Sequence, residues 1–246
     1  MRFSTGGVDD YAPCGWSSLN NCRQNGRDFR AWYEAGGHVA VSNWENADVW
    51  GSDFRDGANG DGEPQGGTEI PEIYFYSGHG ICQNAPTATD PDFIGVCSTN
   101  GTPNVTDIGQ QTRWGNNAST LNFAFLDASC PMDLVSLGST WFNVFWGLHV
   151  AVGHSGTVTQ DTLDSIDRAS QFAALTAGLP WPFPTLSIGD AWMQTGIIDI
   201  QSGCCAVAIA NGRDNAEADQ RVDFERVDSG WGDPSGDWFV WKWMCV

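Results

Sequence analysis

The sequence predicts an α/β fold in which helices cover both faces of a mostly parallel β-sheet. Short apolar runs alternate along the chain with amphipathic segments of helical period, the order that builds such a sheet. The 246 residues include 41% hydrophobic residues and 13 Trp, which is enough to bury one large core. Three of the apolar runs end in unusual tripeptides, Gly-His-Gly, Ala-Ser-Cys and Gly-His-Ser. We expect a single domain over residues 1–246.

Five apolar runs predict the strands of the sheet. Each is bounded by residues typical of turns, such as Gly, Asp and Ser. The runs cover residues 38–43, 72–77, 121–126, 148–152 and 205–210. In open α/β sheets, chemistry gathers at the carboxyl ends of the strands. The tripeptides that follow the second, third and fourth runs are therefore the first place to look for a site.

Four segments predict helices. Residues 21–35 place three aromatic side chains at helical spacing, and Gly36-Gly37 provides a C-terminal stop. The other predicted helices cover residues 140–146, 162–177 and 187–195. Helices between successive strands give the crossover connections that parallel strands require.

Two polar stretches interrupt this pattern. Residues 83–120 are rich in Pro, Thr, Asn and Asp, and we expect them to form a polar insertion that decorates one face of the sheet. Residues 53–67 are rich in Gly and Asp. Their oxygen-bearing side chains alternate with glycines, which suits a structural Ca²⁺, although the spacing is not that of an EF-hand and a solvated turn is the alternative. The candidate ligands are Asp53, Asp56, Asn59, Asp61 and Glu63.

The charge balance narrows the range of partners. Thirty acidic residues against 11 basic ones give a formal net charge of −19. Phosphates would be repelled, so we expect no nucleic acid as a partner. No run of 18 apolar residues exists, so we expect no membrane span. The acidic surface favours cationic substrates or serves solubility alone.

Eight cysteines are present without a CxxC pair or a Cys/His cluster at zinc spacing, which favours disulfides and an extracellular or cell-surface location. The short polar loops between cysteines predict two pairs, Cys14–Cys22 and Cys82–Cys97. Two of the three C-terminal cysteines could form another pair: Cys204, Cys205 and Cys245. Cys130 then remains as the free thiol.

Further features agree with an extracytoplasmic location. Three Asn-x-Ser/Thr sequons mark an exposed loop that would carry glycans if the source glycosylates: Asn100, Asn104 and Asn117. Residues 1–7 contain no apolar stretch, so we expect no signal peptide in this chain and take its start as a processed terminus.

His79 and Cys130 are the strongest candidates for chemistry. Each follows an apolar run, and if the two strands are neighbours, their ends place an imidazole next to a thiol. A cysteine nucleophile needs such a base because the thiolate is the reactive form. The bare backbone at Gly80 would let a substrate carbonyl approach, so the N–H groups of Gly80 and Cys130 are the predicted oxyanion hole.

These two motifs resemble the signature of the caspase-like clan of cysteine peptidases, which includes caspases, legumains, gingipains, clostripain and separase. The quoted residues are Ser77-Gly78-His79-Gly80 and Ala128-Ser129-Cys130, and 51 residues separate His79 from Cys130. Caspases have a separation of about 50. The resemblance implies a caspase-like three-layer sandwich, a dyad of His79 and Cys130, hydrolysis of peptide bonds through a thioester, and no required cofactor.

The chain is also similar, over roughly residues 25–210, to an uncharacterised microbial family of the same fold. The remaining matching residues are Trp44-Glu45, Trp146-Gly-Leu-His149 and Asp190-Ala-Trp192. The residues around Cys130 differ from the caspase pattern Gln-Ala-Cys-x-Gly, so the bond that is cleaved does not follow from the resemblance.

Three further residues are candidates for a substrate pocket. His154 ends the run after that of Cys130, Asp127 lies three residues before Cys130, and Asp190 lies in a segment that follows the pocket strand in this clan. A carboxylate at the base of a pocket pairs best with Arg or Lys, so we expect cleavage after a basic residue. His149 lies inside an apolar run and is interpreted as a core residue.

Three functions remain open, of which a carbohydrate-binding surface protein would use exposed Trp side chains to stack on sugars, and the other two belong to different classes. The first is a cysteine endopeptidase that acts on a peptide or protein and can process itself. The second is a catalytically silent extracellular structural, filament or surface protein that retains the fold. A free Cys130 favours the first, and a Cys130 held in a disulfide favours the second. The sequence leaves the oligomeric state open.

Overall fold

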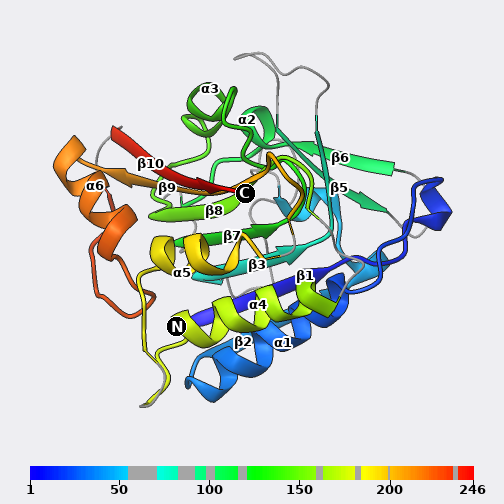
Figure 1. Cartoon of the computed structure of the whole chain (residues 1–246), viewed down its shortest axis with the longest axis horizontal. Helices are drawn as coiled ribbons and strands as arrows, with labels where there is room; N and C mark the ends of the chain where they lie inside the picture. Colours follow the sequence, from blue (N-terminus) through cyan, green and yellow to red (C-terminus); the bar gives the residue numbers. More distant parts are fainter. Residues whose placement is uncertain are drawn as a thin grey trace.

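The computed structural model describes residues 1–54, 71–82, 92–97, 103–115, 121–158, 163–180, 184–198, 200–234 and 238–246. A seven-stranded sheet forms its centre, with the strand order β2-β1-β3-β7-β8-β9-β10 (Figure 1). The strands are β1 (Arg2–Gly7), β2 (Val39–Glu45), β3 (Ile73–Ser77), β7 (Phe123–Asp127), β8 (Val150–Ser155), β9 (Cys205–Gly212) and β10 (Trp238–Cys245).

The sheet is mixed but mostly parallel. Strands β2, β1, β3, β7 and β8 run parallel to their neighbours. The final two strands reverse direction, because β9 pairs antiparallel with β8 and β10 pairs antiparallel with β9. The carboxyl ends of the five parallel strands therefore meet at one edge of the sheet, which is where the sequence predicts the chemistry.

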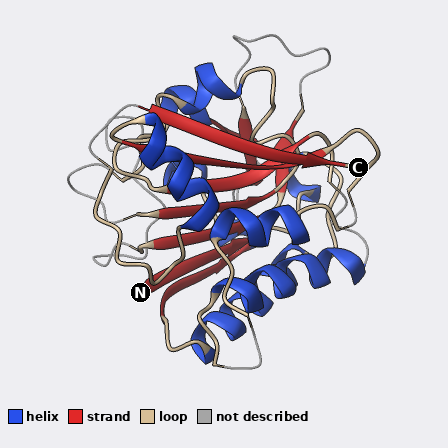
Figure 2. Ribbon diagram, turned by 60° about the vertical axis from the view of Figure 1, so that its left-hand side comes forward, coloured by secondary structure: helices blue, strands red, loops and turns tan. Residues whose placement is uncertain are grey.

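Four helices cover one face of the sheet (Figure 2). They are α1 (Cys22–Ala35), α4 (Leu163–Thr176), α5 (Ile188–Thr195) and α6 (Asn215–Phe224). Aromatic side chains fill this layer: Phe29 of α1 stacks on Phe75 of β3, and Phe172 of α4 packs edge-on against Trp192 of α5. Burial of each such ring stabilises the fold by about 1.5–3 kcal/mol.

The other face carries a layer of mixed composition. It contains the short helices α2 (Ile108–Gln111) and α3 (Leu137–Trp141) and a three-stranded antiparallel sheet in the order β4-β5-β6. These strands are β4 (His79–Ile81), β5 (Phe93–Cys97) and β6 (Pro103–Asp107). Two buried indoles, those of Trp114 and Trp141, meet edge-on in this layer.

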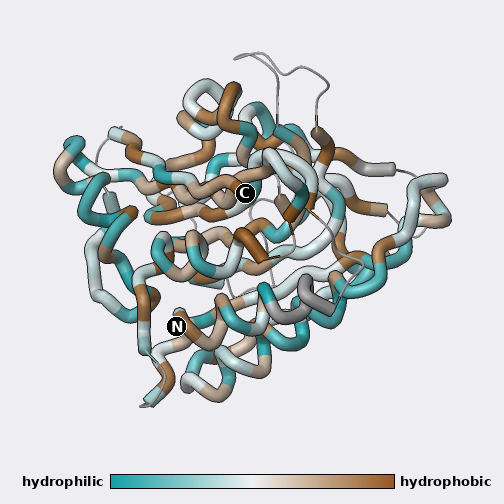
Figure 3. The backbone as a smooth tube through the Cα atoms, viewed as in Figure 1, coloured by the Kyte–Doolittle hydropathy of each residue, from teal (hydrophilic) through white to brown (hydrophobic). Residues whose placement is uncertain are grey.

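The hydropathy of the chain follows these layers. Helix α6 is largely hydrophilic in Figure 3, whereas hydrophobic colour is concentrated along the strands. All five residues of β3 and all five of β7 are buried, as expected for parallel strands covered on both faces. No helix in the described ranges is both long and apolar enough to span a membrane.

The predicted α/β class and mostly parallel sheet are confirmed, as is the coverage of both faces. All five predicted strands exist, with ends shifted by a few residues, and the fifth, β9, is antiparallel. The predicted helix at residues 140–146 is instead the shorter α3, which ends at Trp141. The polar insertion expected at residues 83–120 contains β5, β6 and α2 among its described residues.

The predicted disulfide pairs Cys14–Cys22 and Cys82–Cys97 are also wrong. Cys14 pairs with Cys97, and Cys205 pairs with Cys245 across the β9–β10 ladder. Cys22 is a free, buried thiol in the first turn of α1. Disulfides join cysteines that are close in space. The fold brings Cys97, at the end of β5, next to Cys14, although Cys22 is nearer to Cys14 in the sequence. Three disulfides are consistent with an oxidising compartment.

Asp92 is a buried carboxyl that holds α3 to the start of β5. Its two oxygens accept hydrogen bonds from Ser136 Oγ (2.9 Å) and Trp141 Nε1 (3.2 Å). Burial raises the pKa of Asp92 to about 8, although these hydrogen bonds oppose the shift. The folded state therefore favours the protonated form.

We predict that the protein loses stability as the pH rises from about 7 to about 8. The pKa of Asp92 in the folded state exceeds that of an unfolded Asp, near 4, so unfolding releases a proton in this range, with a slope of at most about 1.4 kcal/mol per pH unit. Asp92→Asn should flatten the slope, measured by urea unfolding at several pH values. Asp28→Asn is the control, because this half-buried carboxylate of α1 accepts a solvent-exposed hydrogen bond from Gln24, and it should retain the slope. An unchanged slope in Asp92→Asn would contradict the assignment.

Candidate active site

The strands that end at the two predicted catalytic motifs are neighbours. β3 and β7 pair in parallel with Ser77 opposite Asp127, so residues 78–80 and 128–130 leave the sheet side by side. The Gly78 N–H donates to the carbonyl of Asp127 at 3.3 Å, which continues the pairing beyond the strands. The prediction that His79 and Cys130 follow adjacent parallel strands is confirmed.

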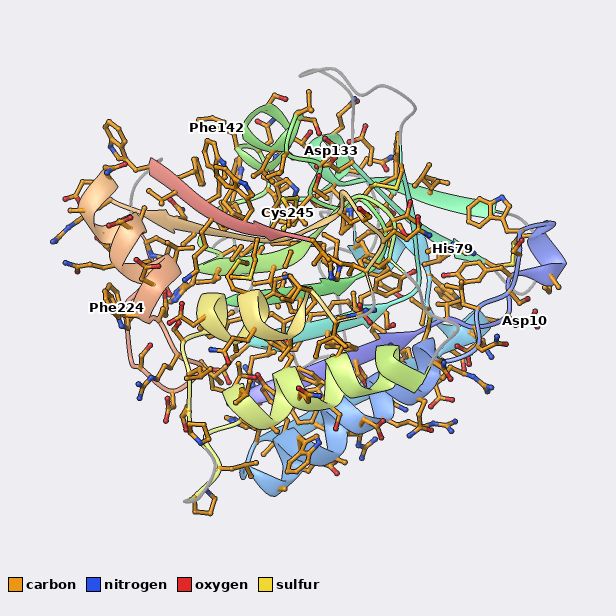
Figure 4. The ribbon with its side chains drawn as sticks, viewed as in Figure 1. Asp10, His79, Asp133, Phe142, Phe224 and Cys245 are labelled. Atoms are coloured by element: carbon orange, nitrogen blue, oxygen red, sulfur yellow. A yellow bond between two sulfur atoms is a disulfide. The ribbon has the colours of Figure 1, made fainter. Side chains whose placement is uncertain are left out.

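His79 lies at the carboxyl edge of the sheet, at the same end of the molecule as Asp10 (Figure 4). Its ring packs edge-on against Tyr11, with centroids 4.3 Å apart, and against Trp16. Its Nε2 lies 2.7 Å from the carbonyl oxygen of Ser17. A carbonyl can only accept, so Nε2 carries a proton, and Nδ1 is the nitrogen left to exchange a proton with a substrate or thiol.

Cys130 is not the free thiol that the sequence predicted. It forms a disulfide with Cys82, the residue that follows β4, with a Cα–Cα distance of 5.0 Å. Cys130 is 3% exposed and adopts a left-handed backbone conformation, with φ of 57°. No hydrogen bond joins the His79 ring to Cys130 among the contacts of the described residues. In this state the sulfur of Cys130 cannot act as a nucleophile.

The predicted oxyanion hole is also not formed in this state. The N–H of Cys130 donates to the carbonyl of Gly156 at 3.0 Å, so it is not available to a substrate oxygen. Gly80 is required by packing rather than by substrate approach: a Cβ at this position would lie 1.8 Å from the carbonyl oxygen of Ser129. β4 thus runs in close contact with residues 128–130, which is how Cys82 reaches Cys130.

Asp127 forms a buried ion pair instead of lining a pocket. Arg168 of α4, which the sequence analysis did not single out, donates to Asp127 Oδ1 from Nε at 2.9 Å and from Nη2 at 2.7 Å. The other oxygen of Asp127 accepts from Asn25 Nδ2 (3.0 Å) and Ser77 Oγ (3.1 Å). Both side chains of the pair are buried, and Arg168 compensates the charge of Asp127. Asp127 therefore does not lie at the bottom of a substrate pocket.

His154 is buried beside this ion pair. Its Nε2 donates to the carbonyl of Gly196 at 2.9 Å, and its ring packs against Trp192. Burial, and to a smaller degree the charge of Arg168, lower the pKa of His154 to about 4. His154 is therefore a neutral, fully buried imidazole that packs behind the strand ends and makes no contact with solvent.

The remaining predicted site residues are scattered. Asp190 lies on α5 and forms an exposed ion pair with Lys242 of β10 at 2.8 Å. Asp53 is buried, and its carboxylate accepts from the N–H of Trp50 at 2.8 Å. The other four candidate calcium ligands lie outside the described residues: Asp56, Asn59, Asp61 and Glu63. Within the described ranges, no cluster of three metal-ligating side chains occurs.

One of the three predicted glycosylation sequons and the predicted core histidine lie within the described residues. Asn104 is in β6, opposite Val96, while Asn100 and Asn117 lie outside the described residues. His149 is a core residue as interpreted, 2% exposed, and its Nδ1 lies 2.6 Å from Glu225 Oε1. Glu225 also binds Arg221 of α6, so this second buried cluster anchors α6 to the sheet.

A surface cavity of about 420 Å³ lies beside α6. Trp231 forms one wall and packs 5.0 Å from the guanidinium of Arg221. The two arginines of the cavity, Arg213 and Arg221, are both paired with Glu217. None of its lining residues belongs to the strand ends that carry His79 and Cys130.

Comparison with known proteins places almost the whole sequence in one family. Residues 5–243 match the family described as Domain of unknown function (DUF6345). The chain belongs to this family. No curated protein matches the sequence. The match includes at least part of every strand of the central sheet, and the paired strand ends and the Cys82–Cys130 disulfide lie within this DUF6345 domain.

We predict that removing one partner of the Asp127–Arg168 pair strongly destabilises this DUF6345 domain. Arg168→Met would leave a buried carboxylate without its partner, at a cost of about 3–5 kcal/mol. Arg27→Met is the matched control, because Arg27 also makes two hydrogen bonds to one carboxylate, that of Glu45, but on the surface. The control should cost less than about 1 kcal/mol. Chemical denaturation measures both, and equal small losses would refute the prediction.

Proposed function

We propose that this chain is a cysteine peptidase of caspase-like architecture in a latent, oxidised state. Cys130 is the nucleophile and His79 the base. The disulfide with Cys82 holds the nucleophile inactive. The observation that carries the proposal is the parallel pairing of β3 with β7, which sets the two motifs side by side at one edge of the sheet.

The topology of the sheet supports the caspase-like architecture. In chain order the seven strands are arranged 2-1-3-4-5-6-7, with the first five parallel and the last two antiparallel. His79 follows the third of these strands and Cys130 follows the fourth. This agrees with the order of motifs in the caspase-like clan that the sequence resembles.

In the reduced form, the chemistry would proceed through a thioester. Nδ1 of His79 accepts the proton of the Cys130 thiol, and the thiolate attacks a peptide carbonyl. The protonated imidazole then gives its proton to the leaving amine, and water hydrolyses the thioester. An oxyanion donor becomes available at Cys130 N–H once its hydrogen bond to Gly156 opens.

The proposed setting is outside the cytosol, and the proposed substrate is a peptide or protein. Three disulfides support an oxidising compartment, and the net charge of −19 supports cationic substrates over nucleic acids. The chemistry requires no cofactor. The preference for Arg or Lys before the cleaved bond now rests on the overall charge, since Asp127 is already paired with Arg168.

A catalytically silent extracellular structural protein is the second candidate. The observation in its favour is that Cys130 is held twice, by the disulfide to Cys82 and by the hydrogen bond of its N–H to Gly156. A protein that has lost catalysis can use a former nucleophile as a structural disulfide, whereas a latent enzyme must be able to release it.

We predict that Cys82→Ser produces an active peptidase without added reductant. The substitution frees Cys130 and leaves its neighbours in place, so fluorogenic peptides should be hydrolysed, with Arg or Lys before the cleaved bond preferred over Asp. Adding Cys130→Ala to this variant should abolish turnover. Adding His79→Gln should lower the rate by about 10²–10⁴-fold.

The control is the double variant Cys205→Ser/Cys245→Ser, which removes a different disulfide and should remain inactive. Iodoacetamide labelling of Cys130 in Cys82→Ser establishes that the thiol is accessible. A labelled, folded Cys82→Ser protein that hydrolyses no peptide would reject the peptidase and favour the silent protein.

A further inference from the structure

A free cysteine contacts the same two residues, Gly156 and Thr157, as the cysteines of the Cys82–Cys130 disulfide. Cys204 is a free, buried cysteine directly before β9. Because β8 and β9 pair with Ser155 opposite Cys205, the next residues beyond that pair, Gly156 and Cys204, face each other where the two strands end. Gly156 is also the residue whose carbonyl accepts the N–H of Cys130.

Two consecutive residues connect the thiol to the disulfide. Cys204 Sγ packs directly on Gly156: a Cβ at that position would lie 2.5 Å from the sulfur. Cys204 Sγ also donates to the carbonyl of Thr157 at 3.1 Å. The hydroxyl of the same Thr157 lies 3.7 Å from Cys82 Sγ. Residues 156–157 thus contact Cys204, Cys82 and Cys130.

We propose that Cys204 is the exchange thiol that releases Cys130. The Cys204 thiolate attacks Cys82 Sγ, a Cys82–Cys204 disulfide forms, and the Cys82–Cys130 bond breaks, with Cys130 leaving as the thiolate. One disulfide is exchanged for another, so no external oxidant or reductant is consumed. The proton lost by Cys204 is taken up by Cys130 or by His79. This inference rests on the proposed function in one respect: the released Cys130 thiolate would serve as the nucleophile of the peptidase.

The contacts select which sulfur is attacked. Thr157 contacts both Cys204 Sγ, through its carbonyl at 3.1 Å, and Cys82 Sγ, through its hydroxyl at 3.7 Å, so Cys82 is the sulfur that we propose is attacked. Attack on Cys82 Sγ releases Cys130 as the thiolate, which is the form required for catalysis. In the resting state, burial raises the pKa of the Cys204 thiol, which keeps it protonated and bonded to Thr157. The latent disulfide therefore persists until Cys204 leaves the Thr157 carbonyl.

The remaining free cysteine provides a comparison. Cys22 is also buried, and burial raises the pKa of its thiol well above the usual value. Its surroundings are Ser77 and Asp127, on the helix-covered side of the strand ends. Cys22→Ser removes one buried thiol, as Cys204→Ser does, without altering the contacts at Thr157.

The test is disulfide mapping of the native chain without reductant. Protein incubated with iodoacetamide, then quenched in acid and digested, should show alkylated Cys130 together with a Cys82–Cys204 peptide pair. In Cys204→Ser, alkylation of Cys130 should slow by about tenfold or more, whereas Cys22→Ser should match the native protein. Equal labelling of Cys130 in all three proteins would overturn the proposal, and so would a Cys204–Cys245 pair as the sole new disulfide.

A second variant tests the geometry separately. Cys130→Ser leaves Cys82 free, and mild oxidation should then join Cys82 to Cys204; if both remain free thiols in the folded variant, the exchange is refuted. Both readouts report sulfur chemistry alone. If exchange occurs but Cys82→Ser hydrolyses no peptide, the exchange stands and the peptidase function fails. If Cys82→Ser is active but no exchange is seen, the peptidase stands and the role of Cys204 fails.

Discussion

The ion pair between Asp127 and Arg168 fixes the part of the structure on which the candidate site depends. Asp127 is the last residue of β7, and it also accepts hydrogen bonds from Ser77, the last residue of β3, and from Asn25 of α1. Two strand ends and two helices are therefore joined at one buried carboxylate. The residues that follow these strand ends, 78–80 and 128–130, start from fixed positions. A buried pair of this kind contributes little net stability but makes the loss of either partner expensive, which favours one arrangement of the elements.

The sequence predicts the parts of the fold that local pattern determines. β3 and β7 are continuous apolar runs because they are covered on both faces, and the motifs after them are recognisable because polar, small residues follow abruptly. β1 is missed because its residues, Arg-Phe-Ser-Thr-Gly-Gly, do not resemble a buried strand. Its glycines are needed for close packing: a Cβ at Gly7 would lie 2.6 Å from the carbonyl oxygen of Cys22. Such a contact depends on the tertiary fold and leaves no periodic signal.

The candidate site illustrates the same limit. The strand-end positions of His79 and Cys130 follow from the sequence, but the state of Cys130 does not. Cys82 reaches Cys130 because β4 belongs to the small second sheet and runs along residues 128–130. Two strands of that sheet, β5 and β6, come from a polar stretch whose composition does not indicate strands, so loop length was the available guide to cysteine pairing, and it was misleading. Arg168 was missed for a related reason, because a single arginine in a predicted helix gives no sign that it is buried opposite a strand end.

The two candidate functions, a latent peptidase and a catalytically silent protein, differ in whether the contacts of Gly156 must be able to open. Its carbonyl holds the N–H of Cys130, and its Cα lies against the sulfur of Cys204, so one glycine links the proposed oxyanion donor to the free thiol. The φ of 98° at Gly156 is a conformation that glycine adopts readily and other residues rarely do. If Cys204 moved away to bond Cys82, the packing that holds Gly156 would be lost on that side. The Cys130 sulfur and the Cys130 N–H would then be released by the same event. A purely structural Cys82–Cys130 disulfide requires no thiol at residue 204, whereas the proposed exchange does.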